Sequence, residues 1–189
     1  MENKKSVRYN VFISWLLSYF FILLIPLCIS IIVYTKSVNN IADELSNLHD
    51  YGIVFGTGKI GERIIDQFSG KLINVHRGII QEYRGLDSDL WAIYHNDFGD
   101  IGTTIHLVEK QLDAGPVINQ GRILINKDMK IYQLRYYTTI MAADLVIEAI
   151  EKNILPQPQS KLGRYYSHMP LILKKTVAEK FDKYVANLC

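Results

Sequence analysis

Residues 51–76, which read YGIVFGTGKIGERIIDQFSGKLINVH, decide the fold class of this chain. The apolar run of residues 51–55 predicts a buried strand that ends in a glycine turn, and residues 62–68 fit a short helix. The apolar residues 72–75 predict a second buried strand. A strand, a turn, a helix and another strand in this order indicate an α/β fold.

The remainder of the chain continues to alternate between the two kinds of element. We expect a loop over residues 76–86, helices over 87–94, 131–153 and 171–188, and strands over 103–108 and within 117–126. The prediction is therefore a sheet with flanking helices.

The apolar residues are concentrated near the N-terminus. Hydrophobic residues make up 49% of the 189-residue chain, and Val11–Tyr34 contains no charged side chain. A helix of this length spans roughly 36 Å, enough to cross a bilayer core of about 30 Å. We expect an uncleaved transmembrane helix over residues 11–34, with a cleaved signal peptide or a buried soluble helix as the alternatives. Residues 36–49 predict a short polar linker helix.

Basic residues flank this segment unequally. Lys4, Lys5 and Arg8 precede it, whereas Lys36 alone follows closely. Because cytoplasmic flanks carry the excess of positive charge, we expect the N-terminus inside and residues 36–189 outside.

The overall charge argues against nucleic acid as a partner. The chain carries 21 basic and 19 acidic residues, of which residues 36–189 hold 18 and 18. A domain of zero net charge lacks the electrostatic footprint that phosphate binding requires. The two cysteines, Cys28 and Cys189, form neither a disulfide framework nor a metal cluster, and we expect no metal.

Three glycines after the first strand match a dinucleotide-binding pattern. Gly56, Gly58 and Gly61 have the spacing G-x-G-x-x-G between a strand and a helix. However, the unit is too short for a full crossover, and the next strand carries Asn74 and His76 where that fingerprint needs an acidic residue. We therefore favour a tight strand-to-helix turn.

Asn74 and His76 form a second candidate site. Residues i and i+2 on a strand point to the same face, so a carboxamide and an imidazole emerge side by side. A carboxamide donates a hydrogen bond to a developing oxyanion, and an imidazole moves protons. Asp113, in a loop between two strands, could orient the imidazole, although an ordinary turn aspartate is the alternative. His106 lies within an alternating strand, and we expect it to be structural.

Together these motifs resemble the folate-dependent formyltransferase family, which includes methionyl-tRNA, glycinamide-ribonucleotide and sugar-amine formyltransferases. The resemblance covers about residues 50–150. The motifs that carry it are Asn74-Val-His76, Tyr83-Arg-Gly85, Trp91-Ala-Ile93, Gly102-Thr-Thr-Ile-His106 and Leu112-Asp-Ala-Gly115. The resemblance implies a partial Rossmann-like formyltransferase sheet, and its sugar-amine branch is the most similar.

The resemblance also implies a reaction, namely transfer of the formyl group of 10-formyltetrahydrofolate to an amine. Asn74 would steady the oxyanion, His76 would move the proton and Asp113 would hold His76. The acceptor would be a small-molecule amine such as a nucleotide-linked amino sugar, or an aminoacyl-tRNA. The implied folate contacts are Phe55, Gly56, Thr57, Gly58, Lys59, Gln111, Leu112, Ala114 and Gly115.

Two departures from the family bear on this expectation. Arg77 and Gln81 stand where the family has prolines, and their flexibility should loosen that loop. The family also begins with an acceptor-binding half that is replaced here by the apolar segment. We expect that loss to expose a sheet edge that could self-associate, forming a homo-oligomer.

The expected organisation has four parts. These are a flank and transmembrane helix (1–35), a linker (36–49), a partial catalytic core (50–155) and a C-terminal extension (156–189). The alternative to an active formyltransferase is a catalytically inactive, membrane-tethered interaction module that arose by fusion or truncation. Reduced folates are cytosolic, which conflicts with the outside location that the flanking charges predict.

Overall fold

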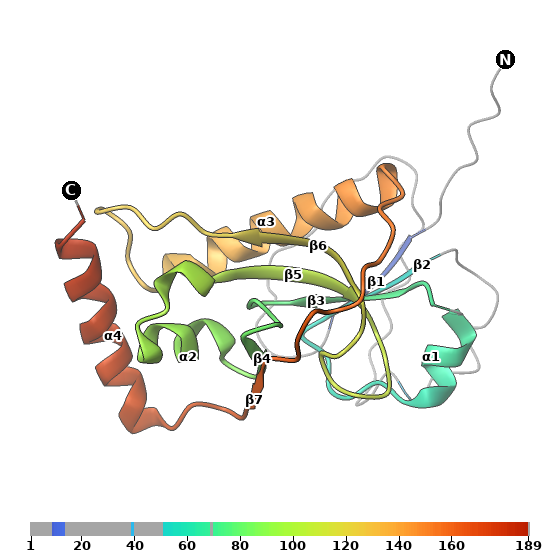
Figure 1. Cartoon of the computed structure of the whole chain (residues 1–189), viewed down its shortest axis with the longest axis horizontal. Coiled ribbons are helices and arrows are strands. Elements are labelled where there is room, and N and C mark those ends of the chain that lie inside the picture. Colours follow the sequence, from blue (N-terminus) through green and yellow to red (C-terminus); the bar gives the residue numbers. More distant parts are fainter. Residues whose placement is uncertain (1–8, 14–38, 40–50, 69, 189) are drawn as a thin grey trace, which may run out of the picture. The chain divides into compact units, whose positions relative to one another are not determined.

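The computed structural model describes residues 9–13, 39, 51–68 and 70–188 (Figure 1). The chain divides into two compact units. The first comprises residues 1–74 and 107–110, and the second comprises residues 75–106 and 111–189. The predicted boundaries at residues 50 and 156 fall inside these units.

The first unit contains the strands and helix that the glycine-turn segment predicts. Strands β1 (Tyr9–Ile13), β2 (Tyr51–Phe55) and the start of β3 (Leu72–His76) are neighbours in that order. β1 runs parallel to β2, with Tyr9 opposite Tyr51. Helix α1 (Glu62–Phe68) follows the turn. The buried core of this unit consists of Val54, Ile60, Ile64, Phe68 and Leu72.

Strand β1 corrects the predicted transmembrane helix over its first residues. Val11–Ile13 belong to β1, where β-branched and aromatic side chains favour an extended backbone, so a helix is wrong there. The rest of the predicted membrane segment and the linker, apart from Asn39, lie outside the described residues. Within the described ranges, every helix is too short or too polar to cross a membrane. β1 also pairs with the edge of β2 that we expected to be exposed.

The second unit is built on an antiparallel strand pair and four helical elements. β5 (Gly102–Leu107) pairs with β6 (Val117–Arg122), with a bulge between Ile105 and His106. The end of β3 neighbours β5. Helix α3 (Gln133–Glu151) lies along β6, as Figure 1 shows. Its buried residues, Leu134, Thr138, Ala142, Val146 and Ala149, recur at helical spacing.

Three further helical elements complete this unit. α2 (Ser88–His95) and α4 (Leu171–Ala186) lie at the predicted positions, whereas the short 3-10 helix η2 (Phe98–Asp100) was not predicted. α4 packs beside α2 (Figure 1). Their shared core contains Ile93 and Phe181, both fully buried. The carboxylate of Asp87 ties the two helix starts together, because Oδ2 accepts a 2.9 Å hydrogen bond from the amide of Met169.

A small parallel sheet corrects the predicted loop over residues 76–86. β4 (Tyr83–Gly85) pairs with β7 (Arg164–Tyr166), with Tyr83 opposite Arg164. Strands of three residues are too short to show an alternating pattern, and the partner lies far along the chain. The sequence therefore gave no signal for this pairing.

We predict that Gly102→Ala will destabilise the chain by about 1–3 kcal/mol, because a Cβ there forces apart two packed backbones. A Cβ at Gly102 would lie 2.1 Å from the carbonyl oxygen of Gly121 on the paired strand. The measurement is urea unfolding followed by circular dichroism. Gly99→Ala is the matched control, since a Cβ at Gly99 meets no atom within 4 Å. Equal unfolding midpoints for the two variants would contradict this account of the β5–β6 contact.

Candidate active site

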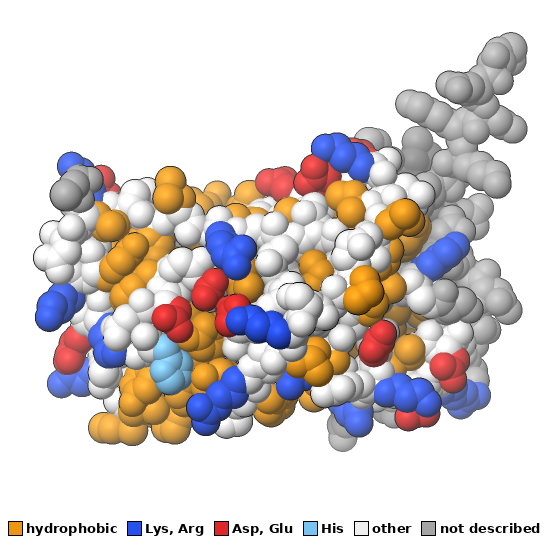
Figure 2. Space-filling view, in the orientation of Figure 1, with side chains coloured by type: hydrophobic (Ala, Val, Ile, Leu, Met, Phe, Trp, Pro, Cys, Tyr) orange, Lys and Arg blue, Asp and Glu red, His pale blue; other side chains and the backbone are white. Residues whose placement is uncertain are grey.

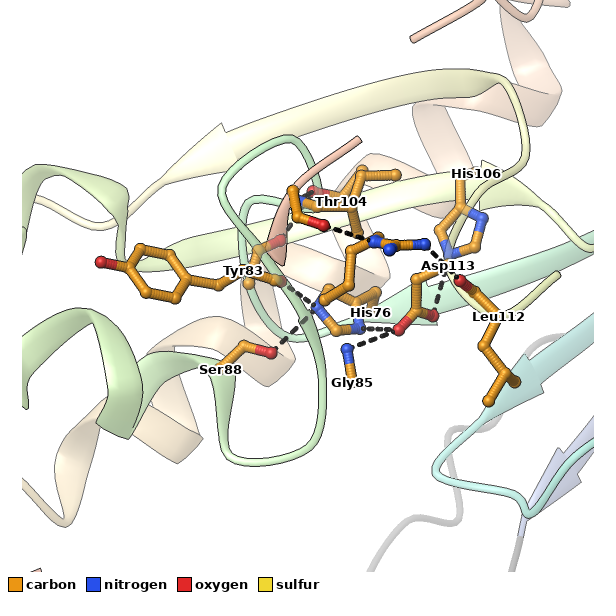
Figure 3. A network of polar contacts seen from close by, with 12 residues as sticks. His76, Tyr83, Gly85, Ser88, Thr104, His106, Leu112 and Asp113 are labelled. Atoms are coloured by element: carbon orange, nitrogen blue, oxygen red, sulfur yellow. Dashed lines mark hydrogen bonds and ion pairs between the residues drawn. The ribbon is translucent and has the colours of Figure 1, made fainter. Parts of the chain in front are cut away.

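Three segments of the second unit bring a carboxylate and two imidazoles together (Figure 3). His76 is the last residue of β3, His106 lies near the end of β5, and Asp113 follows in the loop before β6. The two histidines are only 6% and 2% exposed. Their burial in the sheet fixes the rings, while the loop supplies the charge between them.

The Asp113 carboxylate is the centre of this cluster. Oδ2 lies 3.5 Å from Nδ1 of His76, and Oδ1 lies 3.6 Å from Nε2 of His106. The backbone amide of Gly85 donates a 2.8 Å hydrogen bond to Oδ2. Both oxygens are therefore engaged, as Figure 3 shows.

These contacts keep Asp113 ionised. Burial alone would raise the pKa of this carboxyl, but hydrogen bonding with His106, the charge of His76 and the Gly85 amide outweigh it. Together they lower the pKa of Asp113 to about 2. The site thus holds a permanent negative charge beside His76 at neutral pH.

The imidazole of His76 is contacted at both nitrogens. Nε2 lies 3.0 Å from the carbonyl oxygen of Tyr83 and 3.2 Å from Oγ of Ser88. Because a carbonyl only accepts, Nε2 carries the hydrogen, and Nδ1 is left facing the Asp113 carboxylate. The protonated ring would have an acceptor at each nitrogen.

Burial sets the proton affinity of His76. It lowers the pKa of His76 below the usual 6.5, the charge of Asp113 opposes it, and His106 adds to the lowering. The ring is therefore neutral at pH 7, and the Asp113 carboxylate stabilises the imidazolium that forms when the ring takes up a proton. That combination is what a general base requires.

Ser88, His76 and Asp113 have the connectivity of a hydrolase triad, but their surroundings do not fit that role. Ser88 is buried, and its Oγ lies 3.2 Å from Nε2 of His76. Nε2 of His76 also points its hydrogen at Tyr83, so it is not a free acceptor for the serine proton. We therefore assign Ser88 to holding the ring.

The loop after His76 is held by side chains instead of the family's prolines. Thr104 Oγ1 donates to the carbonyl of Gly78 at 2.6 Å. Gln120 Nε2 donates to Gln81 Oε1 at 2.7 Å and to Thr104 Oγ1 at 2.8 Å. These hydrogen bonds restrain the backbone of the loop. We expected the loop to be loosened because Gln81 stands where the family has a proline.

Asn74 lies on β3 two residues before His76 and is half-buried. Residues two apart on a strand share a face, so the placing of the Asn74 carboxamide beside the imidazole stays a prediction. Asn74 is the last residue of β3 in the first unit, and His76 belongs to the second.

The two segments implied for folate binding fall in different units. Residues 55–59 end β2 and form the turn in the first unit, whereas residues 111–115 form the Asp113 loop in the second. Among the described residues, a Cβ at Gly56 or Gly58 would meet no atom within 4 Å, and both glycines are exposed.

A pocket of about 320 Å³ in the first unit borders this turn. The residues that line it are Asn39, Lys59, Ile60, Gly61, Glu62 and Lys110. Asn39 fixes the turn, because its Nδ2 donates to the Lys59 carbonyl at 3.0 Å and its Oδ1 accepts from the Gly61 amide at 2.7 Å. Lys110 pairs with Glu62 at 2.8 Å.

Metal chemistry finds no support in the part of the chain that the structure describes. No group of three or more His, Cys, Asp or Glu side chains there could hold an ion. The reactive groups are those of a proton-transfer site.

Sequence reasoning missed several members of the site. His106 contacts Asp113 and is not merely structural, and the Gly85 amide and the Tyr83 carbonyl were assigned to a loop. The motifs Gly102-Thr-Thr-Ile-His106 and Tyr83-Arg-Gly85, which carry the resemblance, were the signals that could have identified them.

The fold and the cluster define a class of protein, namely α/β proteins in which a buried carboxylate lies between two imidazoles. The sequence pattern of the family described as "Formyl transferase" matches residues 35–150, well over half of the chain. The chain belongs to the formyl transferase family.

Curated relatives share part of this sequence, and solved structures share the fold. The methionyl-tRNA formyltransferase of Finegoldia magna is 32% identical over 124 residues, which are 64% of this chain and 40% of that protein. The formyltransferase PseJ of Anoxybacillus kamchatkensis has a TM-score of 0.63 at 24% identity and covers 78% of each chain. HypX of Aquifex aeolicus has a TM-score of 0.63 at 20% identity, covering 80% of this chain and 28% of that one. The chain thus spans about 40% of the length of the curated relatives it matches.

We predict that His76 titrates below pH 6.5 and that Asp113→Asn lowers its pKa further, because the carboxylate charge that favours the imidazolium is lost. The measurement is a pH titration of the His76 imidazole by nuclear magnetic resonance. The unfolded chain binds a proton at His76 near pH 6.5 and the folded chain at lower pH, so stability should fall as the pH drops through 6.5.

Asp128→Asn serves as the control, because this exposed residue lies in the turn before α3. A His76 pKa that responds equally to both substitutions, or that rises in Asp113→Asn, would refute the assigned contact.

Proposed function

We propose that this chain transfers a formyl group from 10-formyltetrahydrofolate to an amine. The contact of 3.5 Å between Nδ1 of His76 and the Asp113 carboxylate carries the proposal. Both residues lie within the matched family region, in the motif order Asn-x-His and then Asp. Two of the relatives' structures, PseJ and HypX, hold tetrahydrofolate or tetrahydrofolic acid.

The residues of the site divide the work of such a transfer. The amine nitrogen would add to the formyl carbon, whose carbonyl electron pair moves to oxygen and forms an oxyanion. The carbonyl would then re-form as the bond from that carbon to the folate nitrogen breaks. The proton that the amine loses is taken up by His76 and returned to the departing nitrogen. Asp113 stabilises the imidazolium in between, and the Asn74 carboxamide donates to the oxyanion. A single donor of this kind contributes roughly 2.7–4 kcal/mol to lowering the barrier.

The residues present are compatible with a folate donor, which supplies the one-carbon unit as an electrophilic formyl group. The open backbone of Gly56 and Gly58 allows a flat ring to approach closely. In the second unit, the backbone of residues 111–115 would hold the donor near the carboxylate. In the first unit, the family resemblance implies contacts at Phe55–Lys59.

A nucleotide-linked amino sugar is the acceptor that the observations favour. Residues 36–189 carry no net charge, and Figure 2 shows basic and acidic side chains interspersed among the described residues on the face it presents. A tRNA acceptor would need a basic surface. PseJ, which this chain covers over 78% of its length, was crystallised with a UDP-linked formamido sugar.

We predict that the full-length chain releases tetrahydrofolate and a formylated amine when given 10-formyltetrahydrofolate and a UDP-linked 4-amino sugar. His76→Ala should abolish turnover, and Asn74→Ala should lower kcat about 10²- to 10³-fold, because an oxyanion donor is lost. The measurement is the absorbance of the folate product together with mass spectrometry of the amine.

His168→Ala is the matched control, since this histidine is exposed and lies at the start of α4. Methionyl-tRNA is the competing acceptor, and preferential formylation of tRNA would overturn the sugar assignment. Turnover by His76→Ala at the rate of the unaltered chain would overturn the mechanism.

A catalytically inactive, tethered interaction module is the second proposal. It rests on the uncharged apolar run of residues 11–34. A folded chain that binds tetrahydrofolate by calorimetry but formylates neither acceptor would favour it over the enzyme.

The location follows from the same proposal. Folate chemistry calls for the cytoplasmic side, whereas the charges flanking residues 11–34 favour the outside. We predict that a C-terminal reporter active only outside the cytoplasm will be silent if the chain is a working formyltransferase. Growth selection with that reporter fused after Cys189 makes the measurement. An active reporter would place the domain outside the cytoplasm, where reduced folate is lacking. That result would contradict the proposed formyltransferase activity and favour the inactive module.

A further inference from the structure

The Asp113 loop has an unfavourable backbone conformation. Asp113 adopts a φ of 50°, a left-handed conformation that is uncommon for a residue with a Cβ. Such a conformation persists only where surrounding groups hold it. The groups that hold this loop should therefore be visible in the structure.

One of them is the side chain of Gln159, from the segment after α3. Its Nε2 donates to the carbonyl oxygen of Asp113 at 3.2 Å and to that of Gly115 at 2.8 Å. Two carbonyls facing one amide nitrogen also fix which way the amide points. Gln159 thus clamps the backbone on both sides of the loop's turn.

The second is Arg84, which joins this loop to the same C-terminal segment. Its Nε donates to the carbonyl of Gly163 at 2.7 Å, and one terminal nitrogen donates to the carbonyl of Leu112 at 3.2 Å (Figure 3 labels Leu112). The carbonyls of residues 112, 113 and 115 therefore all accept hydrogen bonds from side chains outside the loop.

The segment that carries Gln159 is itself anchored at both ends. Gln157 exchanges two backbone hydrogen bonds with Val117, of 2.7 and 2.8 Å, at the start of β6. At the other end β7 pairs with β4, which presents the Gly85 amide to Asp113 and the Tyr83 carbonyl to His76. This anchored segment, residues 157–166, lies beyond the family match that ends at residue 150.

We propose that Gln159 is a positioning residue that holds the Asp113 loop so that the carboxylate meets the imidazole of His76. The catalytic meaning of this role rests on the proposed formyl transfer, but the positioning itself does not. It makes the C-terminal segment part of the active site, although no atom of that segment needs to touch a substrate.

The test reads the His76 imidazole directly. The charged and titratable groups that act on it are Asp113 from the loop, His106 from β5 and Asp89 from α2. Gln159→Met keeps the length of the side chain but removes the donor. Because the carboxylate then drifts from the ring, the His76 pKa should fall toward the value in Asp113→Asn. Nuclear magnetic resonance titration of the full-length chain makes the measurement.

Gln157→Met is the matched control, because its side chain is exposed and its anchoring bonds come from the backbone. The double variant Gln159→Met/Asp113→Asn should show no shift beyond that of Asp113→Asn alone. Circular dichroism establishes that each variant is folded. An unchanged His76 pKa in Gln159→Met would overturn the proposal. So would a His76 pKa in the double variant that lies below the value in Asp113→Asn by as much as Gln159→Met lowers it in the unaltered chain.

Activity gives a separate readout. With the amine assay working, Gln159→Met should lower kcat by up to about 10²-fold with little change in KM, as misplacement of a catalytic group does. If no formyl transfer occurs in the unaltered chain, the proposed function fails while the titration still decides the positioning role. A rise in KM with kcat unchanged would contradict the positioning role.

Discussion

The buried carboxylate of Asp113 is the interaction on which the rest of the site depends. A charge placed among the residues of this sheet is costly unless it is paired and hydrogen-bonded. Here His76, His106 and the Gly85 amide supply those partners. Each comes from a different element, so the carboxylate requires β3, β4 and β5 to be in place at once. A change in any one of these strands that moves the Asp113 carboxylate would alter the pKa of His76.

The same requirement explains why a three-residue strand matters. β4 supplies the amide that binds Asp113 and the carbonyl that accepts from His76, and it pairs with β7. The turn from β4 into α2 then places Ser88 against the imidazole. A short pairing between distant segments thus sets the hydrogen-bonding state of the central histidine.

The proton chemistry follows from opposing effects on one ring. Burial disfavours the imidazolium, and the neighbouring carboxylate favours it. The result is a neutral base at pH 7 whose cation remains accessible, which suits a proton that must be taken from an amine and handed on. A family that transfers a formyl group between nitrogens needs such a group, and nothing among the described residues calls for a metal.

The sequence by itself determined the α/β class, the strand that carries Asn74 and His76, and the pairing of His76 with Asp113 through the family motifs. The class and the strand depend on local periodicity, which the chain displays directly, whereas the pairing of His76 with Asp113 was implied by the family resemblance. The strand at Val11–Ile13 was wrongly read as helix, because an apolar run has the same composition in either state. Only the tertiary structure decided that His106 faces Asp113, that β4 pairs with β7, and that Gln159 contacts the loop. The last two contacts join residues far apart in the chain, and the first depends on the conformation of the loop that carries Asp113.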